Sequence, residues 1–329
     1  MKNKANIMVT GGAGYVGSHA VFELIERGHK VYVIDDLSSG HKELLNSAAE
    51  LIECDINDFD KLSSLTKSIE FDSVIHYASK SIVPESFTNP FLYLEGNLKS
   101  AINIIKLMIS KNVNKIIFSS SASVYGKPLC KEIDETHVTD PINPYGTSKL
   151  MIEKMLDSIS QVKKINSLSF RYFNAVGANY KKNIGELHEP ETHLIPNILN
   201  STLPNSDNIS FNVYGNDYST SDGSCIRDYI NVSDLADAHI KGLSWLDDNK
   251  GSHKMNLGTG TGHSVFEIIK ICKDITKDDI KFQVKPRRHG DPAILVANTN
   301  LAKNKLGWNP IKTIEESILE AYEWAMQRK

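Results

Sequence analysis

The sequence of 329 residues has little of several features that would place it in a specialised class of protein. It contains only 4 cysteines, which are scattered along the chain without a CxxC pair. Cysteines of this kind are more typical of small buried hydrophobic side chains than of disulfides or metal ligands. No apolar run approaches the roughly 20 residues that a membrane-spanning helix needs. We therefore expect no membrane partner and a location in the reducing cytoplasm.

An excess of charge of one sign is also missing. The chain carries 37 lysines and arginines against 40 acidic residues, a formal net charge of −3. A nucleic-acid-binding surface needs a strong basic excess or stripe, so nucleic acid is not an expected partner. Hydrophobic residues make up 40% of the sequence and charged residues 23%, the composition of an ordinary globular protein of one large domain or two.

Short β-branched segments alternate with helical stretches through the first half of the chain. Helices are expected after the glycines at 11–17 and over about 91–111 and 144–160, and strands over 6–10, 31–35, 50–54, 73–77, 115–119 and 167–173. Strands separated by helices favour βαβ units and therefore an α/β fold with a doubly wound, parallel sheet.

The composition changes near residue 175. The stretch 177–225 is rich in Asn, Ser, Asp, Gly and Pro and is expected to be a loop. A strand at 228–232, a helix from Ser233 as N-cap to about 246, a strand at 255–257 and two later helices are expected after it. We predict a dinucleotide-binding domain over 1–174, rejoined by about 233–260, and a smaller α/β substrate-binding domain formed mainly by 175–329.

A glycine-rich segment follows the first expected strand. Gly11, Gly14 and Gly17 match the spacing that allows a tight turn, a close approach of the backbone to a pyrophosphate and a helix N-terminus facing that anion. Asp35 ends the second expected strand, near the spacing of about 20 residues at which a carboxylate binds the cofactor ribose. This context predicts a Rossmann sheet that binds NAD, because a carboxylate there would repel the 2′-phosphate of NADP.

Tyr145 and Lys149 form a Tyr-x-x-x-Lys pair, whose spacing places both side chains on one helical face. Ser121 follows a strand end and is expected in the same cleft, since ligands bind at the carboxyl ends of parallel strands. The Lys149 ammonium and a cationic nicotinamide would lower the pKa of the phenol from its usual value near 10. Tyr145 would then serve as a general base for an alcohol.

These motifs, together with several others, resemble the extended short-chain dehydrogenase/reductase family and, within it, the UDP-sugar 4-epimerases. The resemblance covers nearly the whole chain and rests on TGGAGYVGSH (10–19), HYAS (76–79), FSSSASVYG (118–126), NPYGTSK (143–149), RYFNAVGA (171–178), PETHLIP (190–196), YGNDYSTSDGSCIRDYI (214–230), NLGTG (256–260) and PRRHGDP (286–292).

The resemblance implies roles for individual residues of this sequence. Ser121, Tyr145 and Lys149 match the catalytic triad. The residues expected around NAD are Gly11, Gly14, Tyr15, Val16, Gly17, Asp35, Asp36, Asp55, Ile56, Tyr77, Ala78, Ser79, Tyr145, Lys149 and Phe173. Those expected around the UDP-sugar are Ser121, Asn174, His193, Leu194, Asn212, Val213, Tyr214, Arg227, Arg288, Asp291 and Leu295.

The implied reaction is the interconversion of UDP-glucose and UDP-galactose by a cytoplasmic homodimer of galactose metabolism. The 4-hydroxyl would be oxidised, the 4-keto sugar would turn, and hydride would return to its other face. Leu295 is intermediate in size where the family gates the sugar pocket, so UDP-N-acetylhexosamines or UDP-uronates remain alternative substrates. A nucleotide-sugar dehydratase is less favoured because Ala122 and Ser123 follow Ser121 in place of an acidic pair. A non-enzymatic NAD sensor is disfavoured by the intact Tyr-Lys pair.

His188 and His193 superficially resemble a zinc motif, HEPETH. Four residues rather than three separate the two histidines, and Pro190 prevents the helix that would align them. We therefore expect no metal site there.

Overall fold

A seven-stranded parallel sheet forms the centre of the molecule. The computed structural model describes residues 4–203, 211–288 and 290–328. The strand order is β10-β6-β5-β4-β1-β2-β3. The strands are β1 (Asn6–Thr10), β2 (Lys30–Asp35), β3 (Glu50–Glu53), β4 (Ser73–His76), β5 (Lys115–Ser119), β6 (Asn166–Tyr172) and β10 (Ser252–Leu257). This arrangement confirms the α/β fold class predicted from the alternation of strands and helices.

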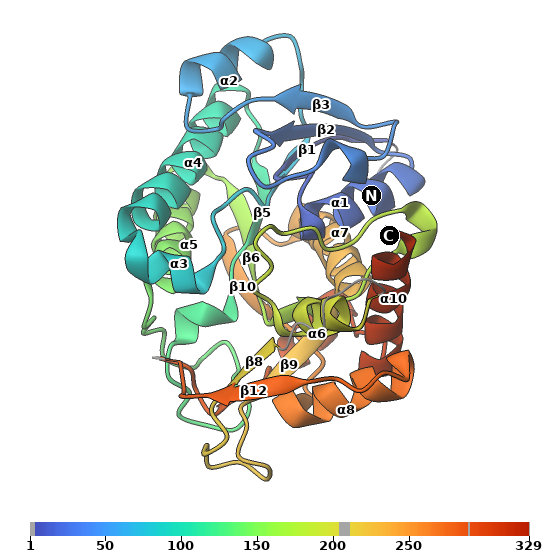
Figure 1. The fold of residues 1–329 in the computed structure, drawn as a ribbon. Coiled ribbons are helices and arrows are strands. Elements are labelled where there is room, and N and C mark those ends of the chain that lie inside the picture. Colours follow the sequence, from blue (N-terminus) through green and yellow to red (C-terminus); the bar gives the residue numbers. More distant parts are fainter. Residues whose placement is uncertain (1–3, 204–210, 289, 329) are drawn as a thin grey trace.

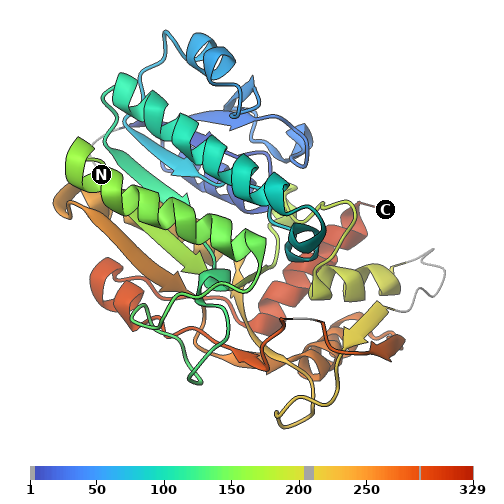
Figure 2. The same ribbon diagram turned by 90° about the vertical axis from the view of Figure 1, so that its left-hand side faces the viewer.

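Alternating side chains of the central strands divide the core into two layers. Ile7 and Val9 of β1 pack with α1 (Tyr15–Glu26) and α7 (Val232–Asp248). Met8, between them, packs on the other face with α4 (Pro90–Ser110) and α5 (Pro144–Lys163). Successive strand residues point to opposite faces, so a strand covered by helices on both sides is apolar throughout. Figure 2 shows α4 and α5 lying side by side across one face of the sheet.

Two smaller sheets and three helices form the lower part of the molecule in Figure 1. One sheet joins β11, β9 and β13, with β7 also paired to β9, and the other joins β12 and β8. Their strands are β7 (Asn174–Val176), β8 (Phe211–Tyr214), β9 (Ile226–Asn231), β11 (Gly262–Ser264), β12 (Phe282–Lys285) and β13 (Ile294–Leu295). The helices that share a hydrophobic cluster with them are α6 (Leu194–Thr202), α8 (Val265–Thr276) and α10 (Ile314–Gln327). The remaining helices are α2 (Phe59–Leu65), α3 (Val83–Thr88) and α9 (Asn300–Leu306).

The structure corrects the expectation of a loop over 177–225. Helix α6 and strand β8 both lie within this stretch, of which residues 204–210 fall outside the described part of the chain. Both elements are short, and β8 is paired with β12, about 70 residues further along the chain. Their order therefore depends on tertiary contacts that a local polar composition does not report.

Helix α7 begins earlier than predicted. Its N-cap is Asn231, not Ser233, and the Asn231 side chain accepts a hydrogen bond from the Ser233 backbone N–H at 2.8 Å. Both residue types are favoured caps, so the sequence alone did not separate them. Among the described residues, no helix is both long and apolar enough to span a bilayer.

Candidate active site

A cleft of about 1460 Å³ opens at the carboxyl ends of the central strands. All the residues that the sequence predicts around a cofactor, a substrate or the catalytic pair line this one cleft. Segments that follow β1, β4, β5 and β6 meet residues of α6, β8 and β9 across it (Figure 1). The fold therefore brings the two predicted groups of residues together, although they are far apart in the sequence.

The glycine-rich turn has no room for side chains. Gly11 has a φ of +68°, and a Cβ there would lie 2.6 Å from the backbone nitrogen of Ala78. A Cβ on Gly17 would lie 2.1 Å from the carbonyl oxygen of Gly11. The N-cap of α1 is Gly14, which has no side-chain capping bond, so the first backbone N–H groups of the helix face the cleft. This bare helix terminus fits a pyrophosphate.

Asp35 closes the other side of this turn. Its carboxylate accepts hydrogen bonds from the backbone N–H groups of Ala13 at 2.9 Å and Leu37 at 3.0 Å. Burial raises the pKa of Asp35, and the two backbone donors oppose that increase. The neighbouring carboxylate of Asp36 accepts from the Ser38 N–H at 2.9 Å. With the bare glycine turn, this pair of acidic residues at the end of β2 fits a dinucleotide carrying a free ribose diol.

Tyr145 and Lys149 lie in the first turns of α5. Asn143 caps this helix by accepting a hydrogen bond from the Gly146 N–H at 2.7 Å, and Pro144 occupies the first helical position. Lys149 Nζ donates to the carbonyl oxygen of Ser119 at 2.7 Å and to Ser79 Oγ at 2.8 Å. It also lies 5.6 Å from the centre of the Tyr145 ring. The lysine thus ties the ends of β4 and β5 to the tyrosine.

The protein alone shifts the pKa of Tyr145 in the opposite direction to the one expected. Burial raises it, and the hydrogen bond with the Ser121 hydroxyl opposes the increase. Burial also lowers the pKa of Lys149 to about 7, so this amine is a weaker source of positive charge than an exposed lysine. The protein groups around Tyr145 therefore do not by themselves lower its pKa.

A buried polar network supports the end of β5 from behind. Arg171 forms a two-point ion pair with Glu153, with Nε to Oε1 at 3.0 Å and an Nη to Oε2 at 2.6 Å. Glu153 also accepts a hydrogen bond from Ser120 Oγ at 2.6 Å, and Arg171 donates to the Tyr125 hydroxyl at 3.2 Å. Because Ser120 precedes the predicted catalytic Ser121, this network fixes the backbone there.

Asn97 holds the loop that follows β4. Its side chain accepts from the Lys80 N–H at 2.8 Å and donates to the Lys80 carbonyl at 3.1 Å and to Ser148 Oγ at 3.0 Å. The preceding residue, Gly96, lines the cleft without a side chain. Asn97 therefore shapes this part of the cleft through the loop that carries Ser79 and Lys80.

On the opposite side, the two predicted arginines differ in how free they are. Arg227 already donates to the carbonyl oxygens of Ile226 and Pro292, each at 2.8 Å, and lies 3.6 Å from the Asp291 carboxylate. Arg288 instead stacks its guanidinium over the Tyr214 ring at 4.0 Å. Arg288 therefore has more donors available for a ligand than Arg227 does.

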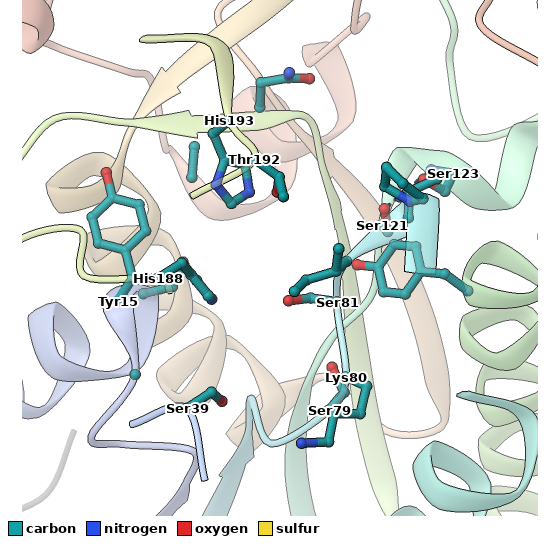
Figure 3. Close-up of a pocket in the computed structure, with 18 of the residues that line it drawn as sticks. Tyr15, Ser39, Ser79, Lys80, Ser81, Ser121, Ser123, His188, Thr192 and His193 are labelled. Atoms are coloured by element: carbon teal, nitrogen blue, oxygen red, sulfur yellow. Dashed lines mark hydrogen bonds between the residues drawn. The ribbon is translucent and has the colours of Figure 1, made fainter. Parts of the chain in front are cut away.

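Three side chains that were not expected at the site, Glu186, His188 and Glu191, line the cleft beside the expected His193. Ligating atoms of Glu186, His188 and His193 lie within 4.8 Å of one another. The spacing argument considered a single helix, whereas here a loop brings the two imidazoles together. Figure 3 shows His188 and His193 on one side of the pocket, with Ser121 and Ser123 across from them.

Comparison with known proteins agrees with this geometry. Residues 7–258 match the model of the NAD dependent epimerase/dehydratase family. The chain is 41% identical over 319 residues to a UDP-glucose 4-epimerase of Lactobacillus helveticus, covering 97% of this chain and 96% of that protein.

Solved structures give the same relationship. A crystal structure of a UDP-glucose 4-epimerase superposes with a TM-score of 0.94 at 41% identity, covering 98% of both chains. The Bifidobacterium longum UDP-glucose 4-epimerase, solved in complex with NAD⁺ and UDP, has a TM-score of 0.92 at 34% identity, also over 98% of both chains. The chain belongs to the NAD dependent epimerase/dehydratase family.

Proposed function

We propose that this chain interconverts UDP-glucose and UDP-galactose by inverting C4 of the sugar, with NAD as a bound cofactor. The observation that carries the proposal is the shared cleft. It contains a bare glycine turn, the Ser121–Tyr145–Lys149 group and the Asn212–Tyr214 strand within one volume. The similarity to UDP-glucose 4-epimerases along nearly the whole chain supports the same reaction.

The cofactor-binding roles follow from the geometry of the turn. Gly11, Gly14 and Gly17 admit the pyrophosphate beside the N–H groups of Tyr15 and Val16. The other proposed contacts are Asp35 and Asp36 for the ribose, Asp55 and Ile56 for the adenine, and Tyr77, Ala78, Ser79 and Phe173 for the remaining cofactor. When bound, NAD would accept a hydride from C4 and later return it.

The catalytic roles belong to three side chains. Tyr145 would take the proton of the 4-hydroxyl and later give it back, while Ser121 holds the same oxygen by a hydrogen bond. Lys149 would hold the cofactor side of the site in place through its hydrogen bonds to Ser79 Oγ and to the Ser119 carbonyl oxygen. Because the sugar has to present both faces, the nucleotide rather than the sugar has to be held firmly.

The substrate-binding roles fall on the lower part of the molecule. Arg288, with Arg227 and Asp291 beside it, is proposed to bind the diphosphate and uridine ribose. Asn212, Val213 and Tyr214 would hold the uracil. Asn174, His193, Leu194 and Leu295 would surround the diphosphate and sugar. We also propose the domain division at 174/175, with about 233–260 rejoining the first domain.

The test is conversion of UDP-galactose by purified protein without added NAD, followed by NMR of the sugar protons. Tyr145→Phe is expected to lower turnover by at least about 10²-fold, because it removes the proton acceptor, and to leave UDP binding unchanged. UDP-N-acetylgalactosamine in a parallel sample determines whether Leu295 admits the larger sugar. Conversion of neither sugar by the native protein would overturn the proposed function.

We further propose a cytoplasmic homodimer formed through α4 and α5. Phe91 and Ile109 on α4, and Met151 and Val162 on α5, are exposed, with Val162 at 71%. A second copy of the helix pair would cover these side chains, and stable interfaces cover about 800 Å² per partner.

The dimer is tested by light scattering coupled to size-exclusion chromatography. We expect a mass of two chains for the native protein and one chain for Val162→Glu, because a buried carboxylate would lack a partner. Leu129→Glu is the matched control, since Leu129 is 77% exposed but lies outside these helices. A one-chain mass for native protein would contradict the dimer.

A further inference from the structure

The loop before α6 contains two units of the same local structure, five residues apart. In the first, Glu186 Oε1 accepts hydrogen bonds from the N–H groups of Leu187 and His188 and from His188 Nδ1. In the second, Glu191 Oε1 accepts from the N–H groups of Thr192 and His193 and from His193 Nδ1. Each Glu-x-His unit thus fixes its imidazole through Nδ1 and leaves Nε2 for another partner.

The loop that carries these units is anchored on both sides. The Glu186 carbonyl accepts a hydrogen bond from Trp324 Nε1 at 3.0 Å, and the His193 carbonyl accepts one from Asn197 Nδ2 at 2.8 Å. His41 also contacts the Leu187 carbonyl through Nε2 at 3.1 Å. The two imidazoles, with ring centres 5.4 Å apart, are therefore held in the cleft wall rather than on a free surface strand.

Both imidazoles line the cleft that the cofactor and substrate regions share. In Figure 3, His188 lies beside Tyr15, at the start of the helix that follows the glycine turn, and His193 lies beside Thr192. His193 is also the N-cap of α6, whose first backbone N–H groups are not capped by its side chain. Because a carboxylate takes Nδ1 of each imidazole, Nε2 is the ring atom left for a diphosphate bound in this cleft.

The charge of this cluster decides whether it can accept an anion. With both imidazoles neutral, the carboxylates of Glu186 and Glu191 give it a formal charge of −2, and with both protonated the charge is zero. A diphosphate would be repelled in the first case and would receive charge-assisted N–H bonds in the second.

The surrounding groups favour protonation. The Glu186 hydrogen bond raises the pKa of His188 against the effect of burial. Burial works to lower the pKa of His193, and the Glu191 hydrogen bond and the two carboxylate charges outweigh it, so the pKa is raised. The other titratable groups in or close to the loop include Glu189 between the two units, Tyr15 and His19 of α1, His41, and also Lys182 and Glu320.

We propose that His188 and His193 bind a nucleotide diphosphate as imidazolium ions, held in place by Glu186 and Glu191, so that binding takes up protons. This inference rests on the proposed function, which supplies two diphosphates, one in NAD and one in the UDP-sugar. Both are diesters that carry no titrating proton near neutral pH, so any proton taken up comes to the protein. By linkage, affinity falls as pH rises through the pKa of each imidazole, by up to about tenfold per pH unit for each proton.

Calorimetry of UDP-glucose binding to the NAD-loaded protein tests the substrate diphosphate. Titrations at pH 7.5 in two buffers of different ionisation enthalpy measure the number of protons taken up. We expect net proton uptake on binding and weaker binding at pH 9 than at pH 6.5. A second arm measures the NAD retained after gel filtration at the two pH values. The arm that responds identifies which diphosphate the imidazoles bind.

Variants separate a binding role from a structural one. His188→Gln with His193→Gln should remove proton uptake and flatten the pH dependence, whereas His253→Gln, on β10 away from the cleft, should change neither. Glu186→Gln is the sharper variant. It removes a negative charge, yet it should reduce proton uptake, because His188 loses the partner that raises its pKa.

Three outcomes would overturn the inference. The first is binding of both ligands without proton uptake. The second is a double histidine variant that takes up as many protons as the native protein does. Either result would contradict the inference and leave the proposed function intact. Failure of both UDP-glucose and NAD to bind would remove the proposed function together with it.

Discussion

At the residue scale, Lys149 is a buried side chain whose environment is unfavourable to its own charge. Its ammonium is bonded to a hydroxyl and a carbonyl rather than to a carboxylate, and only 1% of the residue is exposed. Burial lowers its pKa from 10.5 to about 7, so the unfolded chain binds more protons than the folded one between these values. Stability therefore increases as pH rises through that range, and at neutral pH this lysine is a cost to folding.

We expect Lys149→Met to raise the free energy of unfolding by about 1–2 kcal/mol while removing turnover, because a neutral side chain of similar length needs no desolvation. Urea unfolding of NAD-free protein at pH 7 measures the change, so that loss of bound cofactor does not obscure it. Lys154→Met, one turn further along α5 and exposed, is the matched control and should change stability little. A destabilised Lys149→Met variant would contradict this explanation.

The sequence predicted some of the residues at the site and not others. The glycine turn, Ser121, Tyr145 and Lys149 were predicted because their spacing has a direct physical meaning. Asn97 and the Glu-x-His units were not, because their roles depend on which loops meet in space. The direction of the Tyr145 pKa differed for the same reason: burial is a property of the folded cleft rather than of the Tyr-x-x-x-Lys spacing.

At the scale of elements, α7 is connected to α10 by the residue that begins it. Asn231 caps α7 through its oxygen and, through Nδ2, donates to Ser317 Oγ at 3.0 Å and Glu320 Oε2 at 2.9 Å.

The central-sheet strands and their helices were predicted because long periodic segments carry their own signal. The strands β7, β8, β12 and β13 were not predicted. They have two to four residues each, too few to show a pattern, and their pairing partners are distant in the sequence.

Asn231 allows the cap and the connection between helices to be separated. Asn231→Ala should lower the free energy of unfolding by about 2–3 kcal/mol, since it removes the cap and two hydrogen bonds. Asn231→Ser should lower it by about half as much, because serine still caps the helix. Urea unfolding measured by circular dichroism provides both values. Equal losses in the two variants would mean that the cap contributes nothing, and an unchanged Asn231→Ser variant would mean that the bonds to α10 contribute nothing.

At the scale of the whole molecule, the buried His19, His76 and His239 and the carboxylate-paired His188 and His193 have opposite effects of pH on stability. Burial lowers the pKa of His76 to about 3 and those of His19 and His239 to about 4, so these rings stay neutral when the unfolded chain protonates near 6.5. Their neutral rings therefore lower the free energy of unfolding progressively as pH falls from about 6.5 toward 4. His188 and His193, whose pKa values are raised, stabilise the fold below about 6.5 and lose that effect as pH rises.

The free energy of unfolding should therefore fall as pH decreases below about 6.5, whereas above neutral pH the loss of the His188 and His193 contributions opposes the gain from Lys149. On the acid side each buried imidazole contributes a loss of up to about 1.4 kcal/mol per pH unit. Urea unfolding midpoints at pH 8.5, 7, 6 and 5 would record this curve. His239→Phe should make the loss of stability below pH 6.5 shallower without changing the free energy of unfolding above pH 7. A stability that does not change between pH 7 and 5 would contradict the prediction.

Strand β10 has a consequence for the order in which the protein can be made. It pairs with β6 at the edge of the central sheet, yet it lies more than 75 residues later in the chain. During vectorial synthesis, the ribosome must release residues 252–257 before this edge is covered. Until then the nascent chain presents β6 as an open edge, which is a template for mispairing with another chain. The edge of the central sheet at β6 is therefore covered only late in translation, and a chain truncated before β10 would be prone to aggregate through that edge.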